Sequence, residues 1–168
     1  KAFTFNPRLF NRKTKEMSEQ IDHDENAVSI HVRRGDYLEP KYWKTTGCVC
    51  QLPYYLNAIA EMNKRISQPS YYVFSDDIAW VKENLPLPKA FFIDWNKGTE
   101  SWQDMMLMSR CRHHIICNST FSWWGAWLNP RENKTVIMPE RWFRHCETPD
   151  ICPDKWIKVP INQPDSIQ

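Results

Sequence analysis

The sequence contains little glycine: four residues in a chain of 168. Neither of the glycine-rich loops that commonly bind nucleotide phosphates, GxGxxG and GxxxxGK(S/T), is present. If the protein binds a nucleotide, arginine side chains must therefore do what a glycine-rich loop does in other proteins.

The sequence also lacks long apolar runs and blocks of charge. No stretch approaches the ~20 apolar residues of a transmembrane helix, and no apolar signal-peptide segment follows the first residues. The net charge is +2, without a basic run, so nothing in the composition requires nucleic acid as a partner. We therefore predict no nucleic-acid binding and a cytoplasmic location, with at most peripheral contact at the inner face of a membrane.

Metal-binding patterns are missing as well. Six cysteines are present, but none forms a CxxC pair. A zinc site built from Cys48, Cys50, His145 and Cys146 can be drawn, but no characteristic ligand spacing supports it. Scattered reduced cysteines are the simpler interpretation for a cytoplasmic protein, and we predict neither a metal site nor another cofactor.

Short apolar segments alternate with segments of helical periodicity from Asn26 onward. This alternation indicates a parallel sheet with helices on both faces, so we predict an α/β, Rossmann-like, doubly wound domain. The expected strands are residues 28–32, 71–74, 90–93, 113–117 and 135–138. The expected helices are residues 53–66, a segment from Asp76 or Asp77 to Leu85, and residues 101–111 and 122–128. We expect irregular structure after Pro139.

The chain divides into a lead-in segment (residues 1–25), the Rossmann-like domain (residues 26–160) and a tail (residues 161–168). Within the lead-in, the polar run from Arg12 to Gln20 is expected to continue a helix that begins upstream. Pro53 is expected at the first position of its helix, where proline is favoured.

Three loops that follow predicted strands carry most of the polar chemistry. Because the carboxyl ends of parallel strands lie at one edge of a sheet, these loops are expected to meet where open α/β folds bind ligands. Arginine offers a planar, permanently charged fork that matches phosphate oxygens, and a helix N-terminus binds anions. Nearby carboxylates suit ribose hydroxyls or a base amine. The three loops are His31–Tyr37, Ser75–Asp77 and Asn118–Ser122.

Each of these features also has a simpler structural interpretation. Tandem arginines are commonly a solvated surface pair, and either aspartate of the second loop would cap a helix in many proteins. Ser122 is a good N-cap residue for the helix that follows it. The tryptophans of that helix suit a core better than a sugar-binding platform, and Asp104 by itself would be a solvated helix residue. The joint arrangement of the loops favours a ligand site.

Three longer segments in a fixed order make a more specific pattern than any loop alone. They read His31-Val32-Arg33-Arg34-Gly35-Asp36-Tyr37, Tyr72-Val73-Phe74-Ser75-Asp76-Asp77 and Asn118-Ser119-Thr120-Phe121-Ser122-Trp123-Trp124-Gly125-Ala126-Trp127-Leu128. In this order they resemble the motifs of the α-1,2-fucosyltransferases, glycosyltransferase family 11, in the form similar to the bacterial members. Related α-1,6-fucosyltransferases and protein O-fucosyltransferases share the doubled arginine, so fucosyl transfer is better supported than the 1,2 linkage.

The resemblance implies inverting transfer of L-fucose from GDP-β-L-fucose to a galactose 2-hydroxyl of a glycan acceptor, without a metal ion. It implies that Arg33 and Arg34 bind the donor diphosphate, with Arg34 the stronger candidate, and that His31 lies beneath the donor. Related enzymes read guanine with an aspartate on the helix before the third motif, and Asp104 stands at about that place. The other implied donor-binding residues are Asp77 at the nucleoside, Thr120 and Ser122 at the phosphates, and Asp76, Asn118 and Ser119.

The resemblance leaves the general base open. Asp36 and Glu39 are the candidates, by position only, while the positive charge of Arg34 would stabilise the departing GDP. The family resembles the GT-B architecture, in which two Rossmann-like domains face each other, and 168 residues accommodate one. We therefore expect this chain to be the donor-binding, carboxyl-terminal half, which binds GDP but transfers fucose poorly or not at all alone.

Other functions remain open at the level of sequence. Transfer with another linkage or to another acceptor keeps the same donor chemistry. A non-catalytic carbohydrate-binding module would stack its tryptophans on sugar rings, although such modules are commonly β-sandwiches. A structural or interaction protein would show no ligand-dependent stabilisation.

Overall fold

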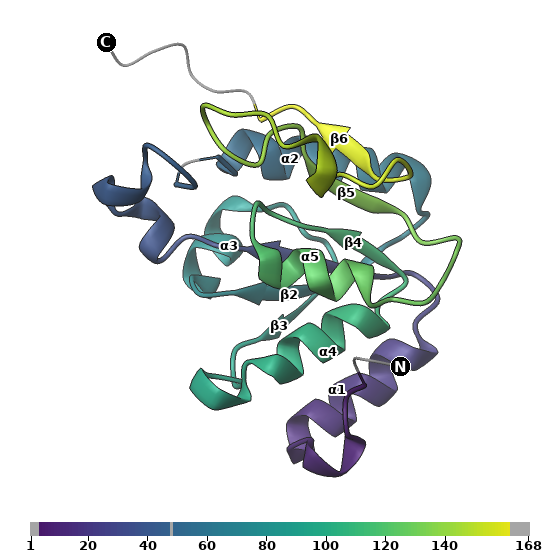
Figure 1. The fold of residues 1–168 in the computed structure, drawn as a ribbon. Coiled ribbons are helices and arrows are strands. Elements are labelled where there is room, and N and C mark those ends of the chain that lie inside the picture. The colour runs from purple at the N-terminus through teal and green to yellow at the C-terminus, as the bar shows by residue number, and fades with distance from the viewer. Residues whose placement is uncertain (1–3, 48, 162–168) are drawn as a thin grey trace.

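Strands and helices alternate along the chain (Figure 1). The computed structural model describes residues 4–47 and 49–161. The strands are β1 (Ala27–Val32), β2 (Ser70–Ser75), β3 (Ala90–Ile93), β4 (His113–Ile115), β5 (Val136–Pro139) and β6 (Ile157–Val159). The α-helices are α1 (Arg12–His23), α2 (Leu52–Arg65), α3 (Ile78–Asn84), α4 (Trp102–Arg110) and α5 (Thr120–Trp127). Short 3₁₀ helices lie at Pro7–Leu9, Asp36–Leu38, Pro40–Tyr42, Gly98–Glu100 and Pro149–Ile151.

The six strands form one sheet in the order β3-β2-β1-β4-β5-β6, and every pairing is parallel. The chain runs outward from β1 to β3 and then crosses back to build β4, β5 and β6. Helices cover both faces of the sheet. This confirms the predicted α/β, Rossmann-like, doubly wound fold, whose direction reverses between β1 and β4.

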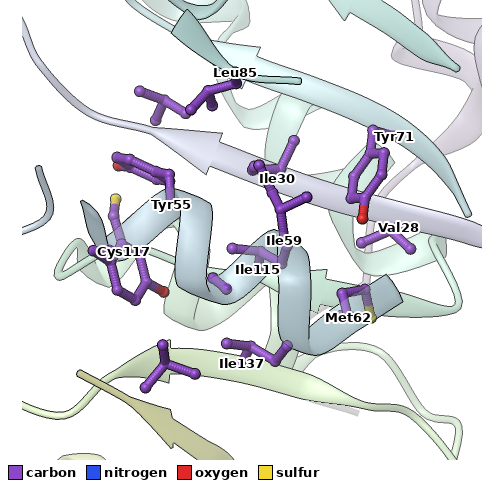
Figure 2. Close-up of a cluster of buried hydrophobic side chains, with 14 of the residues drawn as sticks. Val28, Ile30, Tyr55, Ile59, Met62, Tyr71, Leu85, Ile115, Cys117 and Ile137 are labelled. Atoms are coloured by element: carbon purple, nitrogen blue, oxygen red, sulfur yellow. The ribbon is translucent and has the colours of Figure 1, made fainter. Parts of the chain in front are cut away.

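The central strand, β1, is buried along its whole length because it pairs on both edges and is covered on both faces. Its side chains alternate between the faces, so Val28, Ile30 and Val32 enter the core beneath α2 and α3. Ile59 and Met62 of α2 meet them there (Figure 2). This cluster fixes the position of β1, from whose carboxyl end the first polar loop leaves the sheet.

The opposite face of the sheet is covered by α1, α4 and α5. Ile21 of α1 and Leu107 of α4 pack in one apolar cluster, and Ala126 of α5 packs in a second one beside β5. An ion pair between Arg110 and Asp22 ties α4 to α1. The segment predicted as a lead-in therefore forms part of the packed face. Of the predicted tail, residues 162–168 lie outside the described residues.

The starts of α1 and α2 differ from the prediction. α1 begins at Arg12 and does not continue a helix from upstream, because the side chain of Asn11 accepts a hydrogen bond from the Thr14 N–H (2.9 Å) and caps it. α2 begins at Leu52, so Pro53 occupies its second position and not the first.

A side-chain cap marks the start of α3, and α5 begins earlier than predicted. Of the two adjacent aspartates, Asp77 caps α3: its Oδ1 accepts a hydrogen bond from the Trp80 N–H (3.1 Å). α5 begins at Thr120, so Ser122 is its third residue and not its N-cap as expected. The buried Ser122 hydroxyl donates instead to the Ser119 carbonyl (3.3 Å). The loop before α5 lies two residues earlier than predicted, because β4 ends at Ile115 and α5 begins at Thr120.

The strand β6 corrects the expectation of irregular structure after Pro139. Its three residues pair with β5 in parallel, with Ile157 opposite Ile137 and Val159 opposite Pro139. Ile157-Lys158-Val159 is short and follows a segment rich in proline and charge, so no run of alternating residues marks it in the sequence.

The core cluster under α2 predicts a contrast between two residues of that helix. Ile59 is 3% exposed and Leu56 is 39% exposed. We expect Ile59→Ala to lower the free energy of unfolding by about 2–5 kcal/mol, because it leaves a cavity against the sheet. Leu56→Ala, the matched control, should change it by ~0.5 kcal/mol or less. Urea denaturation followed by circular dichroism measures both, and equal losses would contradict this packing.

Candidate functional site

A cleft of about 710 Å³ lies at the carboxyl edge of the sheet. His31, Phe74 and Ile93, from the ends of β1, β2 and β3, line its base. Its walls come from the loops that follow the first four strands and from the start of α4. Ligands of doubly wound sheets bind in this position, where the strand order reverses, and the volume suits a small molecule. The polar side chains that line it are His31, Arg33, Asp36, Tyr37, Ser75, Asp76, Asp94, Asn96, Lys97, Ser101, Asp104 and Ser119.

Arg33 is the arginine of the pair that lines this cleft. Its guanidinium bonds the carboxylate of Asp36 (Nη2 to Oδ1, 2.9 Å) and that of Asp76 (Nη1 to Oδ2, 3.3 Å). Gly35 allows the two loops to approach: a Cβ there would sit 2.6 Å from Asp76 Oδ2. Two sequence-predicted loops are thus brought together around one cation.

The side chain of Arg34 has different contacts from that of Arg33. Its guanidinium lies 4.0 Å from the ring centroid of Trp80, and its Nε donates to Asp77 Oδ2 (3.1 Å). These contacts place it in a second cavity of about 280 Å³, lined also by Gln51 and Asn84. Arg33 borders both cavities, whereas Arg34 borders the smaller one. Neither Arg34 nor Asp77 lines the larger cleft.

His31 is 7% exposed and lies beside Phe121, with 5.7 Å between the ring centroids. Burial, together with the charge of Arg33, lowers the pKa of His31 to about 3, so the ring is neutral at pH 7. Its Nδ1 lies 3.3 Å from the sulfur of Cys117. Burial raises the pKa of Cys117 to about 12, so the thiol keeps its proton at pH 7. Sequence reasoning gave no role to Cys117 because a lone cysteine carries no pattern.

Asp104 lines the cleft from the first turn of α4. Its Oδ1 accepts a hydrogen bond from the Asn96 side-chain amide (2.8 Å). Burial raises the pKa of Asp104 to about 7, although the bond from Asn96 acts in the opposite direction. The simpler interpretation of Asp104 as a solvated helix residue therefore does not hold, and Asn96, which sequence reasoning missed, is its partner.

The loop before α5 divides between the cleft and the core. Ser119 lines the cleft, and Thr120 is exposed at the first position of α5. Asn118 is buried, and its side-chain amide donates to the carbonyls of Thr46 (2.8 Å) and Trp142 (3.1 Å). Asn118 thus holds three parts of the chain together, and its side chain does not line the cleft.

The two candidates for a general base also separate. Asp36 lines the cleft through its pair with Arg33. Glu39 is exposed and bonds Lys41 (2.7 Å), and it does not line the cleft.

Neither a metal cluster nor a membrane-crossing helix is found within residues 4–47 and 49–161. No group of three or more histidine, cysteine, aspartate or glutamate side chains there is arranged to hold a metal ion. Cys48, one of the four residues from which a zinc site could be drawn, lies outside the described residues. No helix of that part of the chain is both long and apolar enough to cross a bilayer.

The doubly wound sheet and the polar cleft at its reversal point define a Rossmann-like ligand-binding domain. Residues 9–159 match the family model described as "Glycosyl transferase family 11", so the chain belongs to this family.

Individual relatives agree with the family assignment. The chain is 37% identical over 159 residues to an alpha-1,2-colitosyltransferase of Escherichia coli, a match that covers 92% of this chain and 54% of that protein. It is 36% identical over 140 residues to the O-antigen biosynthesis glycosyltransferase WbnK of Escherichia coli, covering 83% and 46%. It is 34% identical over 111 residues to galactoside alpha-(1,2)-fucosyltransferase 1 of Ateles belzebuth, covering 64% and 30%. The chain spans about half the length of the two bacterial relatives.

The buried carboxyl of Asp104 predicts a pH-dependent stability. In an unfolded chain an aspartate has a pKa of about 3.9, whereas here it is raised to about 7. Between these values the folded state keeps a proton that the unfolded state has lost, so the free energy of unfolding falls as pH rises. We expect Asp104→Asn to raise stability by roughly 1–3 kcal/mol at pH ~8 and to leave it nearly unchanged at pH ~4. Urea denaturation at both pH values tests this, and a gain of the same size at both would refute it.

Proposed function

We propose that the cleft binds the nucleotide-sugar donor of an inverting α-1,2-glycosyltransferase. The donor would be GDP-β-L-fucose and the acceptor a galactose 2-hydroxyl of a glycan. The observation that carries this proposal is the lining of the cleft: Arg33, Asp104 and Ser119 come from three separate parts of a family 11 chain and border one space.

The diphosphate would lie between Arg33 and the amino-terminal end of α5. Arg33 now bonds two carboxylates, and phosphate oxygens can replace them with bidentate bonds of the same geometry. Ser119 directly precedes α5, whose first N–H groups have no partners within the helix. Because Arg33 is fixed before the reaction, it would also stabilise the charge that develops on the departing GDP. No metal ion is required in this arrangement.

The base would lie at the Asp104 end of the cleft. An ionised carboxylate accepts hydrogen bonds from two N–H donors at once, and guanine presents its ring N–H beside its exocyclic amine. Adenine lacks this pair of adjacent donors. Asp104 therefore favours a guanine nucleotide over an adenine one, in the ionised form that predominates above pH ~7.

The acceptor hydroxyl must lose its proton during transfer. Of the two candidates, Asp36 is the better placed because it lines the cleft, while Glu39 does not. A nucleotide-sugar donor is supplied in the cytoplasm, which is the location we propose.

A second donor is favoured by one specific observation. The chain is 37% identical to a protein named as a colitosyltransferase, so a nucleotide carrying colitose is the alternative to one carrying fucose. The same cleft would hold the nucleotide in either case. Competition between GDP-fucose and the colitose donor for the cleft discriminates the two.

Calorimetric titration with GDP tests the proposed site. Because Arg33 faces the cleft and Arg34 lies against Trp80, we expect Arg33→Ala to weaken GDP binding by roughly 10- to 150-fold, as for loss of a charge-assisted hydrogen bond of ~1.5–3 kcal/mol. Arg34→Ala should have the smaller effect.

Arg65→Ala is the matched control, since this arginine bonds Glu61 within α2 and should leave GDP binding unchanged. The proposal fails if the folded wild-type chain does not bind GDP, or if Arg33→Ala binds it as tightly as the control. A larger loss in Arg34→Ala than in Arg33→Ala would transfer the diphosphate to the smaller cavity.

A further inference from the structure

A chain of side-chain amides connects the start of α1 to the carboxylate of Asp104. Asn11 donates through Nδ2 to Asn96 Oδ1 (2.7 Å). Asn96 in turn donates through its own Nδ2 to Asp104 Oδ1 (2.8 Å). The three residues come from the cap of α1, the loop after β3 and the first turn of α4.

The orientation of the Asn96 amide is determined by its surroundings. Asn96 is 6% exposed. Its Oδ1 also accepts from the Thr14 hydroxyl (3.2 Å), and that hydroxyl accepts from the Trp95 indole N–H (3.2 Å). Two donors thus converge on one end of the amide, which must be the oxygen. The NH₂ end is left to face Asp104.

A second bond fixes the same end of α4. The N–H of Asn11 donates to the side-chain carbonyl of Gln103 (3.0 Å), the residue before Asp104. Gln103 is fully buried and donates in turn to Glu100. Asn11 therefore holds both Asn96 and the helix that carries Asp104.

We propose that Asn96 is a positioning residue for nucleotide-base recognition: its amide takes one lone pair of Asp104 Oδ1 and fixes the plane of the carboxylate, which leaves Oδ2 and the second lone pair of Oδ1 for the two N–H donors of the base. This inference rests on the proposed function, in which the cleft binds a guanine nucleotide. The bond from Asn96 also favours the ionised, base-accepting form of the carboxylate, and so lowers the pKa that burial raises to about 7. In this proposal the selectivity for guanine depends on Asn96, which borders the cleft but contacts neither the sugar nor the phosphates of the donor.

Other charged groups border the same cleft and contribute to the field at Asp104. The loops after β1 and β2 supply one cation, Arg33, and two carboxylates, Asp36 and Asp76. The loop after β3 supplies one carboxylate, Asp94, and one cation, Lys97. Burial and the Asn96 bond are the causes that act on the Asp104 pKa, so removal of Asn96 has a direct effect on it. The titratable groups of the cleft lining are His31, Arg33, Asp36, Tyr37, Asp76, Asp94, Lys97 and Asp104 itself.

The test compares two substitutions of one residue. Asn96→Leu removes the donor to Asp104. Asn96→Asp keeps the oxygen that Asn11 and Thr14 bond and places a second carboxylate oxygen against Asp104, so it preserves the shape of the wall. Dissociation constants for GDP and ADP are measured by calorimetry from pH ~5.5 to ~9, with the full 168-residue chain.

For the wild type, GDP binding should weaken as pH falls below ~7, as Asp104 becomes protonated. Both variants should bind GDP about tenfold more weakly at pH ~7, and the pH at which GDP binding is half-maximal should rise by about one unit. ADP binding should be unaffected. Carbon NMR of the Asp104 carboxyl in the free chain gives the same midpoint without any nucleotide.

Asn129→Leu is the matched control, because Asn129 is equally buried but bonds His114 and the Cys111 carbonyl away from the cleft. It should lower stability and leave the GDP midpoint unchanged. The inference is overturned if Asn96→Asp and Asn96→Leu weaken GDP and ADP together, or leave the midpoint where it is in the wild type, while the wild type binds GDP. Failure of the wild type to bind GDP overturns the proposed function instead, and this inference with it.

Discussion

The site depends on the burial of β1 at the centre of the sheet. Pairing with β2 and β4 fixes the strand on both edges, and helices fix it on both faces. This fixed strand determines where the chain leaves the sheet towards the first polar loop. Arg33 and Arg34 follow directly after Val32: Arg33 lines the cleft, and Arg34 lies against Trp80.

The central position of β1 also buries its two polar side chains, Ser29 and His31. Ser29 accepts a hydrogen bond from Nδ1 of the buried His114 (2.8 Å), whose Nε2 accepts from Asn129 (2.8 Å). Burial lowers the pKa of His114 well below its usual value, so the ring stays neutral. Its single N–H proton, on Nδ1, forms the bond to Ser29, and both ring nitrogens have a hydrogen-bond partner. His31, two residues along β1, is also buried, and its Nδ1 lies 3.3 Å from the sulfur of Cys117. Two buried, neutral histidines thus lie between the core and the base of the cleft.

The sequence carried the plan of the sheet and the gathering of the polar loops at one of its edges. Alternation of apolar and periodic segments predicted five of the strands and the doubly wound fold. The strand β4 has only three residues but begins the longer apolar segment 113–117, whereas β6, also three residues long, stands among prolines and charged residues and was missed. The division between Arg33 and Arg34 was beyond prediction, since both have the same chemistry and only the direction of the backbone separates them. Asn96 was missed because its role depends on Asn11 and Asp104, which are distant in sequence and adjacent in space.

The charges of the cleft restrict the ligand that it can accept. Four aspartates line it, Asp36, Asp76, Asp94 and Asp104, against two cations, Arg33 and Lys97. An anion entering such a space is repelled unless its charge lies at the cations and at the start of α5. The half-buried Asp104 lies on the opposite wall, on α4, where an N–H donor offsets the cost of its ionisation. A ligand that is anionic in its middle and carries N–H donors at one end matches this distribution of charges. A guanosine diphosphate sugar, the donor proposed above, is of this kind.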